Sequence, residues 1–373
     1  MKILVLKESK LNEKRVALTP AIASQYIKQG YDCFVESNAG YDSNFDNEAY
    51  KNAGCVIVNK LDGLQQADIV IKVNAPSIDE VVAMKAGSIL ISYIYHLFNP
   101  ELVKQLVAAQ ISAFSMDAIP RISRAQSMDA LSSQNNLAGY KAVILGADVM
   151  GKIFPLMMTA AGTLTPSKVL IFGAGVAGLQ AVATAKRLGA VVEVTDVRIE
   201  TKEQVESLGG KFIEVKSEGV KVEGGYAKEV SADYLQKQKE AVNNRLSQAD
   251  LVITTALVAG KKAPVLITED QVKLMKLGSV IVDMAVEQGG NCELSELNKT
   301  VVKHGITIVG QSNLPSTLAQ NASELYAKNI YNLLMHLSSK DGMKWEFEEE
   351  ITKGTLITHQ GKIIHPSLIS AIA

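Results

Sequence analysis

The sequence VLIFGAGVAG at residues 169–178 predicts a buried strand, a tight turn and the first turn of a helix in immediate succession. Gly173, Gly175 and Gly178 have the G-x-G-x-x-G spacing of dinucleotide-binding turns. The first glycine permits the turn, the second lets the backbone approach a pyrophosphate, and the third lets the helix pack on the strand. Amide groups at the helix N-terminus, where Val176 lies, attract phosphates. The stretch therefore predicts a bound nucleotide at the middle of the chain.

A carboxylate follows the next predicted strand. After the helix Leu179–Leu188 and the strand Val191–Val194, Asp196 lies eighteen residues beyond Gly178. This is near the spacing at which a carboxylate accepts hydrogen bonds from the ribose 2′-hydroxyl. Asp196 therefore favours NAD over NADP, because a 2′-phosphate would meet a negative charge. The alternative is an aspartate that only closes a strand at a turn, which the preceding glycine spacing makes less favoured.

Length and charge balance narrow the class of protein. A chain of 373 residues exceeds the size at which one hydrophobic core usually grows, which predicts two domains. Lys and Arg total 38 against 39 Asp and Glu, so a basic surface for nucleic acid or anionic lipid is not expected. The three cysteines, an odd number without C-x-x-C spacing, indicate a reducing cytosol. Without a long apolar run, the chain is expected to be soluble by itself.

Apolar runs of strand length alternate with amphipathic segments of helix length. This alternation predicts an α/β fold of two doubly wound, Rossmann-like domains, each a largely parallel sheet with helices on both faces, with an interdomain cleft. The segments are Ile3–Leu6, Ala21–Lys28, Cys33–Val35, Glu48–Asn52, Val56–Val58, Ile69–Val73, Ile78–Met84, Ile89–Ile94, Glu101–Ala109 and Ala113–Met116, then Val205–Leu208, Phe212–Val215, Tyr234–Leu246, Leu251–Thr254, Val272–Met275, Val280–Met284 and Ile306–Val309, with a hairpin-like tail at Thr355–Ile364.

Two long helical patterns connect the predicted domains. The first runs from Leu137 to about Met158 and leads into the nucleotide-binding strand. The second, Leu318–Leu337, can return the chain to the first domain. We therefore expect an N-terminal Rossmann-like domain of residues 1–131 completed by 318–373, and a nucleotide-binding Rossmann domain of residues 132–317.

A charged, glycine-rich segment at residues 216–228 interrupts the alternation. Its only aromatic residue, Tyr226, follows a Gly-Gly pair. The composition suits a mobile loop. A plain surface connection is an equally good interpretation of the sequence alone. If the segment is a lid, Tyr226 is the residue able to pack on a bound nucleotide.

A dense set of hydrogen-bonding side chains, PRISRAQSMDALSSQNN at residues 120–136, lies at the expected domain junction. Ligands usually bind in clefts between domains, so amide, hydroxyl and guanidinium groups here could fix a nicotinamide carboxamide. The stretch has no pair of nucleophile and base, and hydride transfer needs none, because the cofactors carry the chemistry. The alternative is that these residues cap the long helix expected from about Asn136.

The segment PRISRAQSMDALSSQNNLAGY at residues 120–140 resembles the Arg-Gln-Asp loop of the NAD(H)-binding component, domain I, of proton-translocating nicotinamide nucleotide transhydrogenase. The resemblance continues through the glycine turn and through ATAKRLGA, TKEQVESLGGKF, GGYAKE, TTALVAGKKAPVLIT and VEQGGNC, so it covers nearly the whole chain. It implies a Si/Re-specific, proton-translocating NAD(P)+ transhydrogenase that is active only with partner subunits. NAD(H) would bind here and exchange a hydride with NADP(H) on a partner subunit.

The resemblance implies roles for particular residues. Arg121, Gln126 and Asp129 match the named residues of the loop, Ser132 matches a nicotinamide-contacting serine, and Tyr226 matches the tyrosine of the mobile loop. The first four form the expected catalytic set, with Gln126 reaching the NADP(H) of the partner. The expected cofactor-binding residues are Gly173, Gly175, Val176, Gly178, Asp196, Tyr226, Ser132 and Gln126.

The resemblance also implies partners and a location. Because no membrane segment follows Ala373, the chain resembles the soluble alpha subunit of a split, three-subunit form. The expected partners are a membrane-embedded proton-channel subunit, an NADP(H)-binding subunit and a second copy of the chain in a homodimer. We expect a cytoplasmic protein, peripheral to the inner membrane through those subunits, without nucleic acid and without direct membrane insertion.

Alanine dehydrogenases share this fold and supply a competing interpretation. Arg15, Lys72 and His96 match the substrate and acid–base positions of that family, where Arg and Lys would bind a carboxylate and His would move the proton. We favour an inherited scaffold, because the Arg-Gln-Asp loop has no use in an enzyme that never meets a second nucleotide. A nucleotide-sensing module without catalytic partners is the third alternative. No metal site is expected, because the other histidines are dispersed along the chain.

Overall fold

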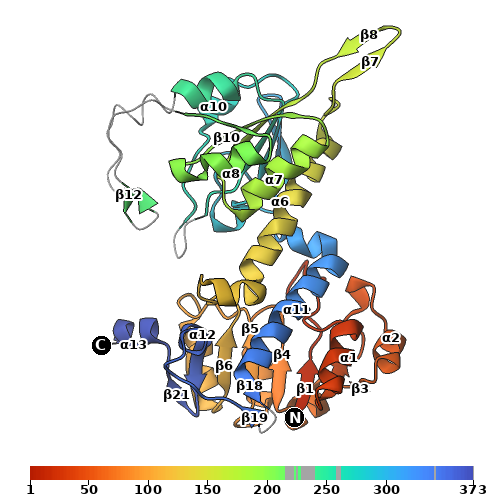
Figure 1. The fold of residues 1–373 in the computed structure, drawn as a ribbon, viewed down its shortest axis with the longest axis vertical. Coiled ribbons are helices and arrows are strands. Elements are labelled where there is room, and N and C mark those ends of the chain that lie inside the picture. Colours follow the sequence, from red (N-terminus) through yellow and green to blue (C-terminus); the bar gives the residue numbers. More distant parts are fainter. Residues whose placement is uncertain (215–221, 224–225, 228–239, 258–261, 340–341, 373) are drawn as a thin grey trace. The chain divides into compact units, whose positions relative to one another are not determined.

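The computed structural model describes residues 1–214, 222–223, 226–227, 240–257, 262–339 and 342–372 (Figure 1). The chain forms two compact units: unit 1 comprises Met1–Gln134 and Pro315–Ala373, and unit 2 comprises Asn135–Leu314. The expected division placed its boundaries at 131/132 and 317/318, a few residues from those of the two units.

Unit 1 contains a Rossmann-type parallel sheet. Its strands follow the spatial order β3-β2-β1-β4-β5-β6, so the order reverses between β1 and β4. Two antiparallel strands from the end of the chain, β20 and β21, extend the sheet beyond β6. The strands are β1 (Lys2–Val5), β2 (Asp32–Glu36), β3 (Val56–Val58), β4 (Ile69–Ile71), β5 (Ile89–Ser92), β6 (Ser112–Ser115), β20 (Leu356–His359) and β21 (Lys362–Ile363).

The central strands β1, β4 and β5 of unit 1 are buried and largely apolar on both faces, and helices pack on each face. Along β1, Ile3 and Val5 pack in one hydrophobic cluster and Leu4 in another, as expected when alternate side chains point to opposite faces. The helices are α1 (Pro20–Lys28), α2 (Asn47–Asn52), α3 (Lys60–Gln66), α4 (Ile78–Ala83), α5 (Pro100–Ala108), α11 (Ala319–Leu337), α12 (Glu350–Thr355) and α13 (Pro366–Ile372), with 3-10 turns η1 (Tyr41–Ser43) and η2 (Ser123–Met128) and the short hairpin β18 (Ser338–Ser339) and β19 (Gly342–Met343).

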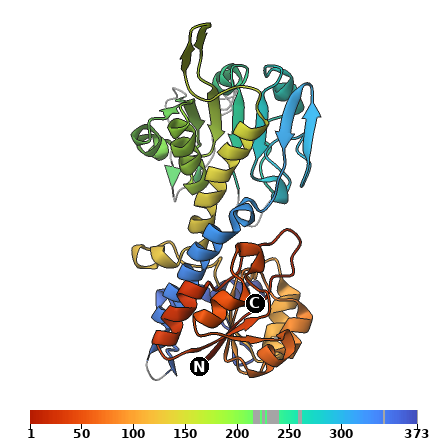
Figure 2. The same cartoon turned by 90° about the vertical axis from the view of Figure 1, so that its right-hand side faces the viewer.

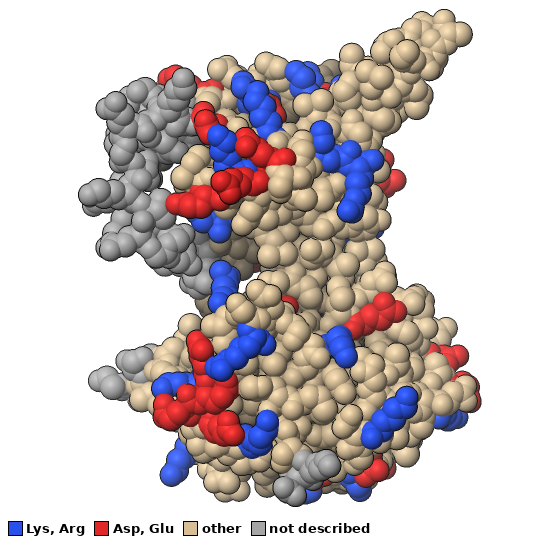
Figure 3. All heavy atoms as spheres, viewed as in Figure 1, with Lys and Arg blue, Asp and Glu red and all other residues tan. Residues whose placement is uncertain are grey.

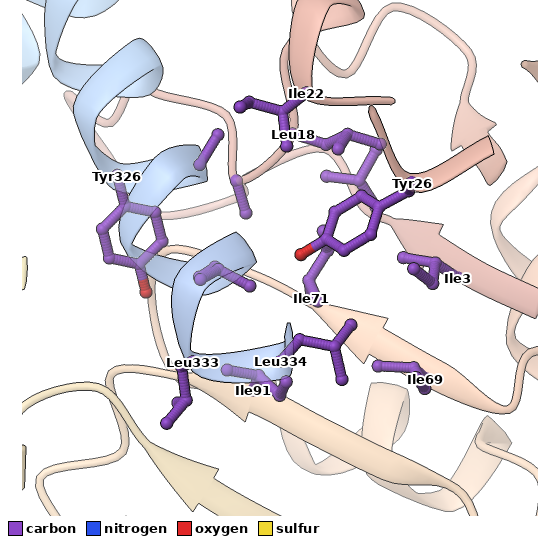
Figure 4. Packing of buried hydrophobic residues seen from close by; sticks show 14 of the residues in the cluster. Ile3, Leu18, Ile22, Tyr26, Ile69, Ile71, Ile91, Tyr326, Leu333 and Leu334 are labelled. Carbon is purple, nitrogen blue, oxygen red and sulfur yellow. The ribbon is translucent and has the colours of Figure 1, made fainter. Parts of the chain in front are cut away.

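Helix α11 returns the chain to unit 1 and joins its core. Tyr326, Leu333 and Leu334 lie in the same cluster as Ile71 and Ile91 of the central strands, as Figure 4 shows. Fully burying a side chain of this size contributes about 1.5–3 kcal/mol. Helix α11 is therefore part of the hydrophobic core of unit 1.

Unit 2 repeats the architecture. Its strand order β11-β10-β9-β14-β15-β17 also reverses once, between β9 and β14, and the antiparallel β16 closes the far edge. The strands are β9 (Lys168–Phe172), β10 (Val191–Thr195), β11 (Lys211–Phe212), β14 (Leu251–Thr254), β15 (Val280–Asp283), β16 (Thr300–Lys303) and β17 (Ile306–Val309). Ligands of open parallel sheets bind at the carboxyl ends of the strands where the order reverses. The turn after β9 lies at that point.

The helices of unit 2 lie before its sheet and between its strands in the sequence. They are α6 (Ala130–Val149), which begins in unit 1, then α7 (Val176–Arg187), α8 (Lys202–Ser207) and α10 (Glu269–Lys273), with 3-10 turns η3 (Ile199–Thr201), η4 (Val286–Gln288) and η5 (Leu314–Leu318) and the short strands β12 (Val222–Glu223) and β13 (Tyr226–Ala227). Residues 240–246, the described part of the segment expected at Tyr234–Leu246, are helical.

Three features differ from the sequence expectations. Helix α6 begins at Ala130 rather than near Asn136, because Asp129 caps a polar first turn that cannot be recognised from the spacing of apolar residues. The helix ends at Val149. A hairpin of β7 (Met157–Thr159) and β8 (Gly162–Leu164) replaces the expected end of that helix and projects from unit 2 (Figure 2). Helix α3 was not expected, and its N-cap Asn59 accepts a hydrogen bond from the Asp62 amide.

The surface agrees with the balanced composition. Figure 3 shows positive and negative side chains intermixed on the face in view, without a broad region of one sign. No helix among the described residues is long and apolar enough to cross a membrane. The three cysteines are buried and form no disulfide.

Candidate dinucleotide site

The glycine turn after β9 depends on two positions where a side chain would not fit. Gly173 has φ +103°, a conformation that favours glycine, and a Cβ there would overlap Thr255 Oγ1. A Cβ at Gly178 would overlap the Gly173 carbonyl oxygen and lie 2.9 Å from its carbon. These contacts fix the start of α7 against the end of β9.

The N-terminus of α7 has no side-chain cap. Its N-cap residue is Gly175, which offers no side-chain oxygen, and a Cβ at Gly175 would meet no atom within 4 Å. The first amides of a helix lack intrahelical acceptors. Together with the helix dipole, such amides bind an anion. The turn thus has the space and the donors that a pyrophosphate needs.

Asp196 follows β10 and lies beside this turn. One oxygen accepts from the Ala174 amide at 2.6 Å, and the other from the Arg198 amide at 2.8 Å. The Arg198 guanidinium adds two hydrogen bonds of 3.0 Å, from Nε and from Nη2. Burial raises the pKa of the Asp196 carboxyl, but these donors outweigh burial and the pKa lies below its ordinary value. Asp196 is therefore ionised at neutral pH, and sequence reasoning missed its partner Arg198.

Two buried polar side chains hold the loops that follow β14 and β15. Asp283 accepts hydrogen bonds from Thr254 Oγ1 at 3.1 Å and from the Cys292 amide at 2.9 Å. Asn291 accepts from the Ala256 amide at 3.0 Å and donates back to the Ala256 carbonyl at 2.9 Å. Both side chains belong to fully buried residues. They fix the loops beside the glycine turn, and no sequence motif pointed to them.

The polar stretch expected at the nicotinamide end lies in η2 and the first turn of α6. Asp129 caps α6: its two oxygens accept from the Ser132 amide at 2.9 Å and from Ser132 Oγ at 2.6 Å. Gln126 and Arg121 are exposed, and within the described ranges neither side chain makes a hydrogen bond or ion pair. The geometry thus joins Asp129 to Ser132 and leaves Arg121 and Gln126 directed to solvent.

Helix α11 holds this stretch in place. The Ser127 carbonyl accepts hydrogen bonds of 2.9 Å from both Asn329 and Asn332. Arg124 forms an ion pair of 2.9 Å with Glu349 at the start of α12. The turn that carries Gln126 is therefore fixed by its neighbours rather than by Gln126 itself.

Tyr226 lies in β13, where Glu223 of β12 is its antiparallel partner. The Tyr226 side chain and most of the segment 216–228 lie outside the described residues. Its contact with a nucleotide stays a prediction.

The three positions that match alanine dehydrogenases are all buried in unit 1. Arg15 forms a forked ion pair with Glu13, at 2.8 Å from Nε and 2.6 Å from Nη2. Lys72 Nζ lies 2.7 Å from Glu80 Oε2. Burial raises the pKa of Glu13, but the hydrogen bond and charge of Arg15 dominate and lower it to about 2. Both cations therefore already have a carboxylate partner within the chain.

His96 lies against His365, with ring centroids 4.5 Å apart. Its Nε2 is 3.2 Å from Ser367 Oγ, and its Nδ1 has no hydrogen-bond partner in the described part of the chain. Burial and the neighbouring His365 lower its pKa, so the ring is neutral at pH 7. No group of His, Cys, Asp and Glu among the described residues could hold a metal ion.

A bare helix N-terminus at the point where the strand order reverses, with a carboxylate after the next strand, is typical of doubly wound dinucleotide-binding proteins. That is the class which the fold of unit 2 and its glycine turn define. Unit 1 has the same sheet order without a comparable glycine turn after β1.

Comparison with known proteins identifies the family. The family model described as the N-terminal domain of alanine dehydrogenase/PNT matches residues 4–138, and the model of the C-terminal domain matches residues 142–366. The chain is 51% identical to an NAD(P) transhydrogenase alpha-subunit protein from Rhodospirillum rubrum, over 99% of both chains. The chain belongs to the alanine dehydrogenase/PNT family of oxidoreductases, with the transhydrogenase alpha subunits among its relatives.

Solved structures agree with this assignment. A transhydrogenase from Sinorhizobium meliloti is 41% identical and superposes with a TM-score of 0.90, covering 98% of this chain and all of the other. An L-alanine dehydrogenase is 26% identical with a TM-score of 0.82, covering all of this chain and 99% of the other. The resemblance read from the sequence, and the α/β fold of two Rossmann-like domains, are thereby confirmed.

Proposed function

We propose that this chain is the NAD(H)-binding subunit of a proton-translocating transhydrogenase. It would exchange a hydride between NAD(H) bound at the glycine turn and NADP(H) on a partner subunit, coupled to proton movement through a membrane-embedded subunit. The observation that carries the proposal is the uncapped N-terminus of α7 behind Gly173, in a chain 51% identical to a transhydrogenase alpha subunit. We further propose that the chain works as a homodimer on the cytoplasmic side of the inner membrane.

The residues of the chain would bind and orient the reactants. Amides at the start of α7 would bind the pyrophosphate, and Asp196 would accept hydrogen bonds from the adenosine ribose. The nicotinamide supplies the hydride carbon, so no acid or base is required from the protein. Asp129 holds Ser132 Oγ at 2.6 Å and so orients it for a carboxamide. Gln126, exposed on η2, is suited to reach a nucleotide on another subunit.

Reconstitution tests the proposal directly. The purified chain would be mixed with the NADP(H)-binding component of a bacterial transhydrogenase, and reduction of an NAD analogue by NADPH would be followed by absorbance. We expect reduction only when both components are present, because each holds one nicotinamide. Each component alone is the control. Binding of NADH to the chain without any transfer in the mixture would instead support a nucleotide-sensing module.

The second candidate function is an amino-acid dehydrogenase, since Arg15, Lys72 and His96 are all in place. The ion pairs of the first two residues argue against it. Glu13 already balances the charge of Arg15, and Glu80 that of Lys72, so a substrate carboxylate would meet two cations whose charges are already compensated within the chain. Transhydrogenase function leaves these pairs intact.

We therefore expect no formation of NADH from L-alanine and NAD by the purified chain. The measurement is NADH absorbance at saturating substrates, with an authentic alanine dehydrogenase assayed in parallel as the positive control. Robust alanine-dependent NADH formation that His96→Ala abolishes would reverse the ranking of the two functions.

A further inference from the structure

The carboxylate expected to bind the ribose is already fully used by donors from its own chain. The side chain of Asp196 is 5% exposed, and its two oxygens receive four hydrogen bonds. Two come from the amides of Ala174 and Arg198, and two from the Arg198 guanidinium. A carboxylate has about four acceptor positions. No position is left for a ribose hydroxyl unless one donor moves.

The guanidinium is the donor that can move. The two amides are fixed by the backbone of the glycine turn and of the segment after β10, whereas the Arg198 guanidinium is 39% exposed and reaches Asp196 through rotatable side-chain bonds. A ribose diol at Asp196 must therefore displace the guanidinium. The displaced guanidinium stays beside the ribose, because Arg198 is only two residues from Asp196 in the sequence. Guanidinium binds phosphate in the same forked geometry as carboxylate.

We propose that Arg198 is a specificity-determining residue of the dinucleotide site, a potential anchor for a 2′-phosphate that Asp196 keeps occupied. The inference rests on the proposed NAD(H) site and refines its preference. The ion pair of Asp196 and Arg198 has no net charge, so it does not repel a 2′-phosphate. The site rejects the phosphate because the Arg198 guanidinium, which would bind it, is engaged by the Asp196 carboxylate. Removing the carboxylate would then not only weaken the binding of NADH but also create affinity for NADP(H).

The test compares dissociation constants of NADH, NADPH, ADP and 2′,5′-ADP, measured by calorimetry on the full chain. In Asp196→Asn we expect NADH to bind more weakly and NADPH to bind about tenfold or more tightly than in the wild type, as for one new charge-assisted contact. The same gain is expected for 2′,5′-ADP over ADP, which lack the nicotinamide. Adding Arg198→Gln should abolish the gain. Adding Arg187→Gln, at the other end of α7, should leave it intact.

The outcomes separate the inference from the function on which it rests. If Asp196→Asn gains nothing for NADPH, or if the gain survives Arg198→Gln, Arg198 is not the determinant, whatever the wild type does with NADH. If the wild type binds neither NADH nor ADP, the dinucleotide site itself is wrong and the inference falls with it. Circular dichroism would verify folding, and Asp196→Ser would replace the asparagine variant if that variant is misfolded.

Discussion

Replacing Gly178 by alanine is expected to raise the dissociation constant for NADH about a hundredfold. The new Cβ would overlap the Gly173 carbonyl oxygen and lie 2.9 Å from the Gly173 carbon. Both are backbone atoms of the turn, so relief requires the start of α7 to move away from β9. A shift of this kind misaims the amides that would bind the pyrophosphate, and a hundredfold corresponds to about 2.7 kcal/mol of binding free energy.

Two other glycines in unit 2 supply the controls for this prediction. Gly151 has no atom within 4 Å of a Cβ and lies away from the turn, so Gly151→Ala should leave NADH binding unchanged. A Cβ at Gly175 also meets no atom within 4 Å, so Gly175→Ala should fold normally and yet bind NADH weakly, because its methyl group would occupy the space of the pyrophosphate. Titrations of NADH fluorescence and thermal melts distinguish these cases. Wild-type affinity in Gly178→Ala would show that the turn does not form the nucleotide site.

The parallel strands could be predicted from the sequence because they are buried on both faces. The run Ile69–Ile71 is fully buried, and so is Leu251–Thr254, and continuous apolar runs of this length are typical of parallel sheets. The hairpin of β7 and β8 could not be predicted in this way. All of its strand residues are exposed, so its sequence lacks the alternation that marks a half-buried strand.

Some residues of the candidate site could likewise be predicted from the sequence, whereas others are brought together only by the fold. The glycines and Asp196 have a spacing that follows from the local strand, turn and helix. Arg198 is two residues away, but nothing in the sequence says that its side chain folds back onto Asp196. Asp283 and Asn291 form hydrogen bonds between loops that the sheet brings together. Such contacts cannot be predicted from a single sequence.

The start of α6 illustrates a third limit, the competition between two interpretations of the same polar residues. The stretch at 120–136 could be a nicotinamide site or a helix cap, and the contacts of Asp129 with Ser132 are those of a cap. Capping does not exclude binding, because a carboxylate that orients a hydroxyl also prepares it for a ligand. The two roles must therefore be separated at a residue that takes no part in the cap.

Gln126 is that residue, and Gln126→Asn is expected to slow hydride transfer in the reconstituted complex about a hundredfold. The side chain is exposed on η2, while the turn is held by the contacts of Ser127 with α11 and by Arg124 with Glu349. Shortening the side chain by one methylene should thus leave the fold and the NADH dissociation constant nearly unchanged. Exposed substitutions of this kind usually change stability by less than about 0.5 kcal/mol.

The rate is expected to respond because hydride transfer tolerates little misplacement. The reacting carbons must approach to roughly 3–3.5 Å, and an amide that donates and accepts at the subunit junction would help to set that distance. A hundredfold loss corresponds to about 2.7 kcal/mol of transition-state stabilisation. Single-turnover stopped-flow measurements at saturating nucleotides report this step, with Gln29→Asn, an exposed glutamine at the end of α1, as the matched control. A wild-type rate in Gln126→Asn would mean that the stretch only caps α6, since a positioning role cannot survive retraction of the amide without a change in rate.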